Sequence, residues 1–123
     1  DTDNMVENEQ GTQIKNIFSE YGEDFFRELA EIIEPKVILC LGRNTFEGVL
    51  TAFDKRAHVR IKGFNGFIES GNNPVSAQLR SGKTVNIFAL AHCGNMGTLN
   101  RNQKKHMRLD AQILDWQRIK YYL

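Results

Sequence analysis

Two short apolar runs constrain the fold of this chain more than any other feature. Residues 36–42 and residues 85–92 are rich in apolar and β-branched side chains, and the first run does not alternate with polar residues. Runs of this length and composition are typical of strands covered on both faces, as in a parallel sheet. The sequence therefore predicts two buried strands, the first of them central and parallel, with helices that cover them.

The residues around these runs have helical spacing. Gly22 is expected to separate two helices, and Pro35 is expected to end the second because proline cannot continue a helix. The apolar positions of this pair are Ile14, Ile17, Phe18, Tyr21, Phe25, Leu29, Ile32 and Ile33. A third helix, capped by Asn44 or Thr45, is expected after the first strand, and a last helix is expected from about residue 104 to about residue 121. The core-facing positions of the last helix are expected to be Leu109, Ile113, Trp116 and Ile119 or Lys120.

Helices that alternate with buried strands predict an α/β fold of three layers, in which a mostly parallel sheet is flanked by helices. Residues 58–62 alternate apolar and basic side chains and are expected to form an edge strand. Residues 63–82 hold four glycines and Pro74 and are expected to be mostly loop. We expect a disordered lead-in over residues 1–12 and a single α/β domain over residues 13–123, which is enough chain for one core.

The net charge of +1 conceals an uneven distribution. Residues 1–34 carry ten acidic and two basic side chains, whereas residues 35–123 carry five acidic and fourteen basic ones. A basic excess of this size favours polyanionic partners. The alternative is that the two parts neutralise one another across a packed interface, and charge alone does not decide between these interpretations.

Several classes of site find no support in the sequence. The two cysteines, Cys40 and Cys93, lie in or beside apolar runs and are expected to be reduced and mostly buried, so no metal or other cofactor is expected. No apolar run is long enough to span a membrane. The tetrapeptide of residues 81–84, Ser-Gly-Lys-Thr, precedes a strand, whereas a phosphate-binding loop follows one. The serines lie in no nucleophile-elbow pattern.

The segment that follows the second strand carries the best candidate chemistry. His92 lies at the strand end, where ligands of open α/β sheets bind. Gly94 and Gly97 allow close approach of backbone to a ligand, and Met96 is an apolar side chain that could enter a base stack. The competing interpretation is a histidine bonded to backbone in a loop whose glycines only permit the turn.

The same segments resemble the uracil-DNA glycosylase superfamily. The resemblance covers most of the chain from Phe25 onward. Its parts are a helix that ends at residues 33–36, the strand of residues 37–42, a strand that runs into His92, the pair Asn100-Arg101, and a last helix that contains Trp116. The resemblance implies the C-terminal part of a glycosylase-like domain, which would hydrolyse the N-glycosidic bond of a flipped, damaged base in DNA.

The resemblance also implies roles for particular residues. His92 would be the catalytic residue, which stabilises the O2 side of the departing uracil anion. The DNA-binding residues would be Gly94, Asn95, Met96 and Gly97 in the minor groove, with Arg101, supported by Lys104, on backbone phosphates. Two departures stand out: Cys93-Gly94 occupies the place of the usual Pro-Ser, and the motif that positions the hydrolytic water is absent from the chain.

The expected partners are DNA, either uracil-containing or abasic, and the missing N-terminal part of the same domain, with no membrane. The expected location is intracellular, which in a prokaryote is the cytoplasm. An alternative is a non-catalytic α/β module that binds nucleic acid or another protein. A third hypothesis is a small-ligand α/β protein that uses the turn of residues 41–45.

Overall fold

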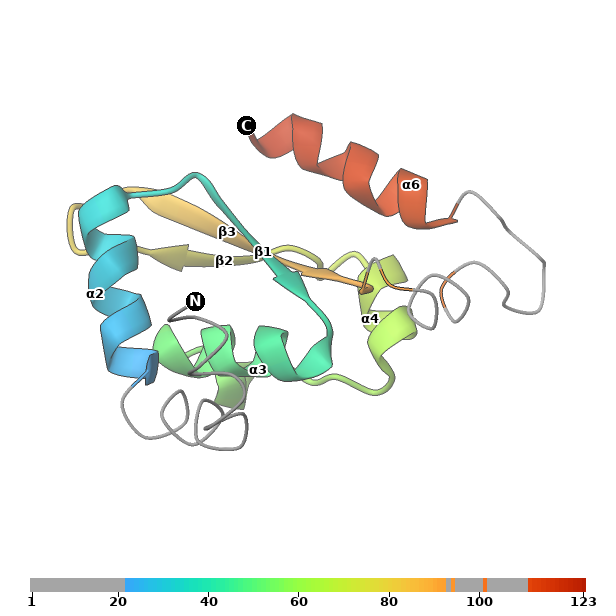
Figure 1. Ribbon diagram of the computed structural model, residues 1–123, viewed down its shortest axis with the longest axis horizontal. Coiled ribbons are helices and arrows are strands. Elements are labelled where there is room, and N and C mark those ends of the chain that lie inside the picture. The colour runs from blue at the N-terminus through green and yellow to red at the C-terminus, as the bar shows by residue number, and fades with distance from the viewer. Residues whose placement is uncertain (1–21, 93, 95–100, 102–110) are drawn as a thin grey trace, which may run out of the picture.

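The computed structural model describes residues 22–92, 94, 101 and 111–123, which form a small α/β unit (Figure 1). In chain order the elements are α2 (Glu23–Ile33), β1 (Val37–Leu41), α3 (Arg43–Ala52), the 3-10 helix η2 (Arg56–His58), α4 (Phe64–Glu69), β2 (Val75–Gln78), β3 (Thr84–Leu90), α6 (Ala111–Gln117) and the 3-10 helix η3 (Arg118–Tyr122). The predicted lead-in and the first predicted helix lie outside the described residues.

The described strands form one mixed sheet in the order β1-β3-β2. β1 pairs with β3 in parallel, with Leu39 opposite Phe88, and β2 pairs with β3 in antiparallel orientation. Both predicted strands are confirmed, but the sheet is not mostly parallel. The prediction that the first strand is central is also wrong: in this sheet β3 is central and β1 is at the edge, which leaves Leu39 partly exposed.

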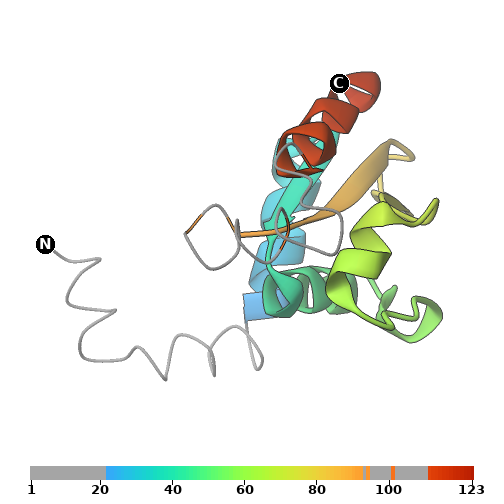
Figure 2. The ribbon, with the colours of Figure 1, turned by 90° about the vertical axis from the view of Figure 1, so that its right-hand side faces the viewer.

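Helices cover both faces of the sheet, so the predicted layering is observed (Figures 1 and 2). Alternate residues of a strand point to opposite faces. On one face Ile87 and Ala89 join Cys40 in the main core, together with Phe46 and Leu50 of α3. On the other face Phe88 and Leu90 pack against Ile119 of η3, with Trp116 of α6 beside them.

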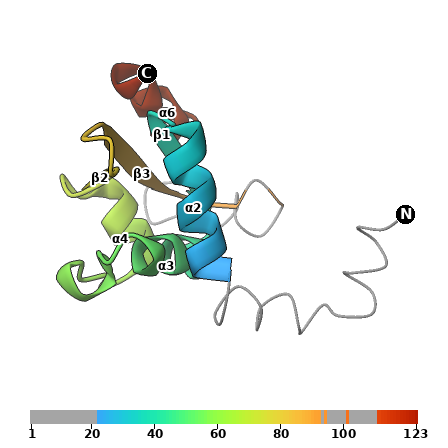
Figure 3. The same cartoon turned by 90° about the vertical axis from the view of Figure 1, so that its left-hand side faces the viewer.

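The helix α2 is confirmed, but its apolar stripe is not buried. Ile32 is 75% exposed, and Phe25 and Ile33 are also exposed. Ala30 and the half-buried Phe26 face the core. Figure 3 shows α2 beside α3. The helix ends at Ile33, as the proline stop predicts, and Glu34 takes a left-handed conformation with φ 52° at the helix end.

The segment between α3 and β3 differs most from the prediction. Residues 58–62 form no strand, because η2 ends at His58 and the chain then reaches α4 through irregular backbone with a bend at Lys62. Residues 63–82 were expected to be loop, yet they contain α4 and β2. The buried Phe67 and Ile68 anchor α4 in the core, so tertiary packing outweighs the local effect of the glycines.

Ion pairs connect the acidic helix α2 to the turn between β2 and β3. Arg80 bonds to Glu28 at 2.6 Å, and its backbone N–H donates to Glu31 at 2.8 Å. Lys83 lies 3.8 Å from Glu34. The acidic and basic parts of the chain therefore neutralise one another in part. In the portion of the chain that the structure describes, no helix is long and apolar enough to cross a bilayer.

Candidate functional site

The carboxyl ends of β1 and β3 form a topological switch point. Both strands run in the same direction, and β1 leads into α3 on one face of the sheet. The helix α6, which comes after β3 in the chain, packs on the opposite face. When the elements that follow two neighbouring parallel strands lie on opposite faces, the two connections leave the sheet in opposite directions. A crevice forms between them, outside the carboxyl ends of the strands. Ligands of open α/β sheets bind at such a point.

Gly42 and His92 meet at this switch point. Gly42 directly follows β1, and its N–H donates to the Leu90 carbonyl oxygen at 2.8 Å, which holds the two strand ends together. A Cβ atom on Gly42 would overlap Nε2 of His92, so the imidazole lies directly against the glycine α-carbon. Gly42 also has φ 92°, a conformation that side chains rarely adopt. The backbone conformation therefore favours glycine here, and a Cβ would also push the exposed His92 ring aside.

The first turn of α3 opens beside this pair. Gly42 is the N-cap residue, and no side chain caps the helix; the predicted capping by Asn44 or Thr45 is wrong. The first intrahelical bond runs from the Phe46 N–H to the Gly42 carbonyl oxygen. The N–H groups at the start of a helix are donors that need an outside partner, and the helix dipole favours an anion there. No acidic residue lies in this first turn, and Arg43 is exposed.

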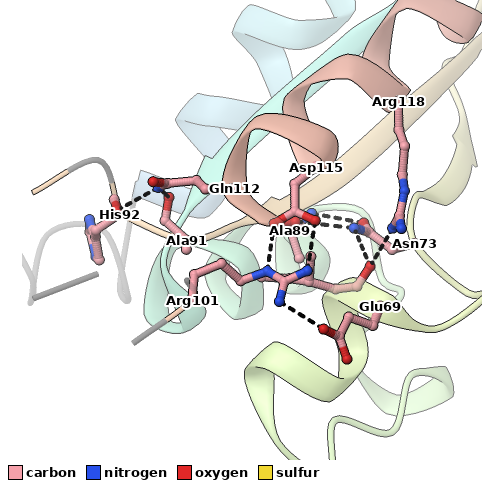
Figure 4. Close-up of polar contacts among 10 residues, drawn as sticks. Glu69, Asn73, Ala89, Ala91, His92, Arg101, Gln112, Asp115 and Arg118 are labelled. Carbon is pink, nitrogen blue, oxygen red and sulfur yellow. Dashed lines mark hydrogen bonds and ion pairs between the residues drawn. The ribbon is translucent and has the colours of Figure 1, made fainter. Parts of the chain in front are cut away.

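Two amide side chains fix the end of β3 (Figure 4). The Asn73 side chain bonds to Ala89 as the backbone of a neighbouring strand would. Its Oδ1 accepts from the Ala89 N–H at 3.0 Å, and its Nδ2 donates to the Ala89 carbonyl oxygen at 3.1 Å. On the other side, Nε2 of Gln112 in α6 donates to the His92 carbonyl oxygen at 2.9 Å. The end of β3 is therefore held by side chains from two distant segments of the chain.

Arg101 lies in a buried ion-pair network (Figure 4). Its guanidinium donates to both oxygens of Asp115, at 2.6 and 2.9 Å, and to Glu69 at 2.8 Å. Arg101 is 4% exposed and Asp115 is 2% exposed. The pKa of Arg101 is raised, mainly by its side-chain hydrogen bond to Asp115. We assign Arg101 a structural role that joins α6 to α4, a role that competes with its predicted contact to a phosphate.

The remaining predicted site residues are placed as follows. Gly94 is exposed, and Asn95, Met96, Gly97 and Lys104 lie outside the described residues. Their predicted contact with DNA, and DNA as the partner, stay predictions. Residues 81–83 lie in the turn from β2 into β3, and Thr84 begins β3, so the tetrapeptide precedes a strand as expected.

Cysteine and metal chemistry can be assessed in the described residues. Cys40 is free and buried, and burial raises the pKa of its thiol to about 12, which makes it an unreactive core residue. Within residues 22–92, 94, 101 and 111–123, no group of three or more His, Cys, Asp or Glu side chains could hold a metal ion.

The residues that build this site were only partly visible in the sequence. His92 and Gly42 were predicted at strand ends. Sequence reasoning missed Asn73, Gln112 and the Arg101–Asp115 pair. Their contacts join residues 14 or more positions apart, and no local sequence pattern indicates which distant residues meet in the fold. The dipeptide Asn73-Pro74 signals a turn, and that was its only available signal.

The comparison with protein families gives one match to report. A family model described as shikimate kinase matches residues 1–46, which is fewer than half of the 123 residues. Of the described elements, this match includes α2, β1 and the first residues of α3. No curated protein and no solved structure matches the chain. The chain is thus similar to this kinase family over little more than its first third.

This match overturns the predicted resemblance to uracil-DNA glycosylases. The matching family is a kinase family, so the predicted superfamily, the role in DNA repair and the excision of a base by N-glycosidic hydrolysis are wrong. The predicted glycosylase-like fold is likewise not confirmed. The physical reason is that the residues behind the resemblance are strand ends followed by glycine and histidine, which also occur at switch points of unrelated α/β proteins.

Proposed function

We propose that this protein binds the phosphate group of a small phosphorylated molecule, such as a nucleotide, at the carboxyl ends of β1 and β3. The observation that carries the proposal is the switch point itself, where an uncapped helix N-terminus opens beside His92. The N–H groups of residues 43–45 would donate to phosphate oxygens, and the helix dipole would favour their charge. Arg43 and His92 would add side-chain donors at the rim.

The kinase-family match supports this placement, because it includes the junction between β1 and α3. Phosphoryl transfer is not part of the proposal. A phosphate-binding loop of the Gly-Lys-Ser/Thr type supplies the lysine that reaches the transferred phosphates, and residues 1–46 contain no such sequence. The proposed function is therefore ligand binding. We include an intracellular location in the proposal, since Cys40 is a free thiol.

The test is a titration of the isotope-labelled chain with inorganic phosphate and with AMP, followed by NMR at the amides of Arg43, Asn44 and Thr45. We expect saturable shifts with a Kd of about 0.1–10 mM, because a single anion site with few contacts binds weakly. Sodium chloride at equal ionic strength is the reference. Equal shifts in chloride and phosphate, or shifts that do not saturate, would overturn the proposal.

Two glycine variants make this test specific. Gly42→Ala introduces a methyl group where the His92 ring lies, so it displaces the ring and should abolish phosphate binding. Gly82→Ala is the matched control, because Gly82 has φ 91°, close to that of Gly42, and a Cβ there meets nothing within 4 Å. It should bind phosphate like the unchanged protein. Similar losses in both variants would mean that binding depends on general stability.

A DNA backbone presents the same phosphate chemistry, and we keep DNA as a second candidate because the basic excess of residues 35–123 is only partly neutralised. A duplex contacted through several phosphates loses affinity steeply as salt rises, whereas one small phosphate does not. A steep salt dependence with duplex DNA and weak AMP binding would favour DNA. The reverse pattern would favour the small ligand.

A further inference from the structure

A cavity that shares no residue with the switch point lies among η2, α4 and β2. Its volume is about 430 Å³, which is within the usual range for small-molecule sites. The lining residues are His58, Val59, Arg60, Phe67, Asn72 and Val75. Nothing in the proposed phosphate site uses this cavity.

The interior of this cavity is apolar and well supported. Phe67 is buried in the main core, where its ring centroid lies 5.2 Å from that of Phe46. Val59 and Val75 are half-buried and pack against the same core. These three side chains offer no hydrogen-bond donor or acceptor. The inner part of the cavity therefore favours an apolar group, because a polar group there would lose some of its hydrogen bonds to water.

The rim of the cavity is polar and lacks acidic residues. Arg60 and His58 are exposed, and Asn72 adds an amide. Among the residues that the structure describes, the Arg60 side chain makes no hydrogen bond and no ion pair. A guanidinium without a partner presents a fork of donors that matches the two oxygens of a carboxylate.

The surrounding charge reinforces this preference. Residues 55–62 contain Lys55, Arg56, Arg60 and Lys62 and no acidic residue. The nearby Glu47 is already bonded to Arg43 at 2.7 Å and to Arg56 at 3.5 Å. The field at the rim is therefore positive, and an anionic group is favoured over a neutral one of the same shape.

We propose that this cavity binds a small aryl carboxylate, with the ring against Val59, Phe67 and Val75 and the carboxylate bidentate on Arg60. The apolar interior selects the ring, and the exposed Arg60 guanidinium selects the charge. His58 and Asn72 donate to the carboxylate from the rim.

The experiment uses three probes on the full chain, with NMR at the amides of Val59, Phe67 and Val75 as the readout. Benzoate should bind saturably, with a Kd of about 1–10 mM for a ligand of this size. Benzamide has the same shape without the charge, and acetate has the charge without the ring. Benzamide and acetate should each bind at least tenfold more weakly than benzoate. A difference of about this size is needed to distinguish a specific site from non-specific attraction of anions or apolar molecules.

Two variants locate the charge. Arg60→Gln should weaken benzoate binding at least tenfold, and its exposed position means that the fold should be unaffected. Lys62→Gln removes the same charge from the same segment but does not line the cavity, so binding should fall less than threefold. The proposal is overturned if benzoate does not saturate, if benzamide binds as tightly, or if both variants lose the same affinity. Because the readout amides differ from those of the phosphate site, failure of one proposal does not imply failure of the other.

Discussion

The buried pair of Arg101 and Asp115 should be essential for stability, and Asp115→Ala tests this directly. The substitution removes two charge-assisted hydrogen bonds, of 2.6 and 2.9 Å, and leaves a guanidinium that is 4% exposed, with Glu69 as its remaining partner among the described residues. Breaking a buried pair by removing one partner costs about 3–5 kcal/mol, since the remaining charge stays desolvated. Whole domains are stable by about 5–15 kcal/mol, so this loss brings the chain close to unfolding.

The assay is urea unfolding followed by circular dichroism. With a dependence on urea of about 1–1.5 kcal/mol per molar for a chain of this size, the midpoint should fall by about 2–5 M. Glu69→Gln is the control on the same arginine. Because the Glu69 side chain is 56% exposed, this change should cost under about 1 kcal/mol.

A double variant keeps the reasoning testable even if Asp115→Ala does not fold. Arg101→Met with Asp115→Leu replaces both charges by apolar groups, and such replacements are often neutral or stabilising. We expect the double variant to recover most of the lost stability. The reasoning is refuted if Asp115→Ala unfolds within about 1 kcal/mol of the unchanged protein, or if the double variant is no more stable than the single one.

Three further predictions concern other contacts. Asn73→Ala should lower stability by about 2–3 kcal/mol in the same urea assay, because it leaves the buried N–H and C=O of Ala89 without partners. Cys40 should resist iodoacetamide at pH 8 until urea unfolds the chain, as read for this site by mass spectrometry; rapid modification of the folded protein would contradict its raised pKa of about 12. A hydrogen bond from Arg80 lowers the pKa of Glu28 below 4.5, and one from Arg27 does the same for Glu31. The contribution of these two carboxylates to the stability of the fold is therefore present above about pH 4.5 and is lost as pH falls further. Arg80→Ala should flatten the fall in unfolding midpoint below pH 4.5, and an unchanged slope would count against this pair.

The sequence predicted those elements whose signal is local and strong. The strand pattern of β3 and the proline stop after α2 were both confirmed, because an apolar run and a missing N–H act within a few residues. The central position of β1 was wrong. An apolar run indicates burial but does not reveal how many neighbouring strands a strand has. In the described sheet β1 has one neighbour, β3, and Leu39 of β1 is partly exposed.

The segment from η2 to β2 was mispredicted because two kinds of information compete there. Glycines lower helix propensity by up to about 1 kcal/mol each, which favoured loop. Phe67 and Ile68 bury their side chains completely or nearly so in the core, and burial of one such side chain is worth about 1.5–3 kcal/mol. Burial therefore outweighs propensity at α4, and it depends on the strands that the helix covers, which the local sequence does not encode.

The same limit explains why the strand ends were predicted better than the function. A buried strand followed by glycine, and another that ends in histidine, predict a switch point with a ligand crevice, and Gly42 and His92 do meet there. This geometry belongs to the α/β architecture and is shared by proteins of unrelated activity. Activity depends on the groups that close around the crevice. Here these include an uncapped helix N-terminus beside His92, while Arg101 is withdrawn into the core by Asp115. The sequence spacing suggested Arg101 as a ligand contact and gave no sign of its pairing with Asp115 fourteen residues later, a pairing that competes with the predicted role.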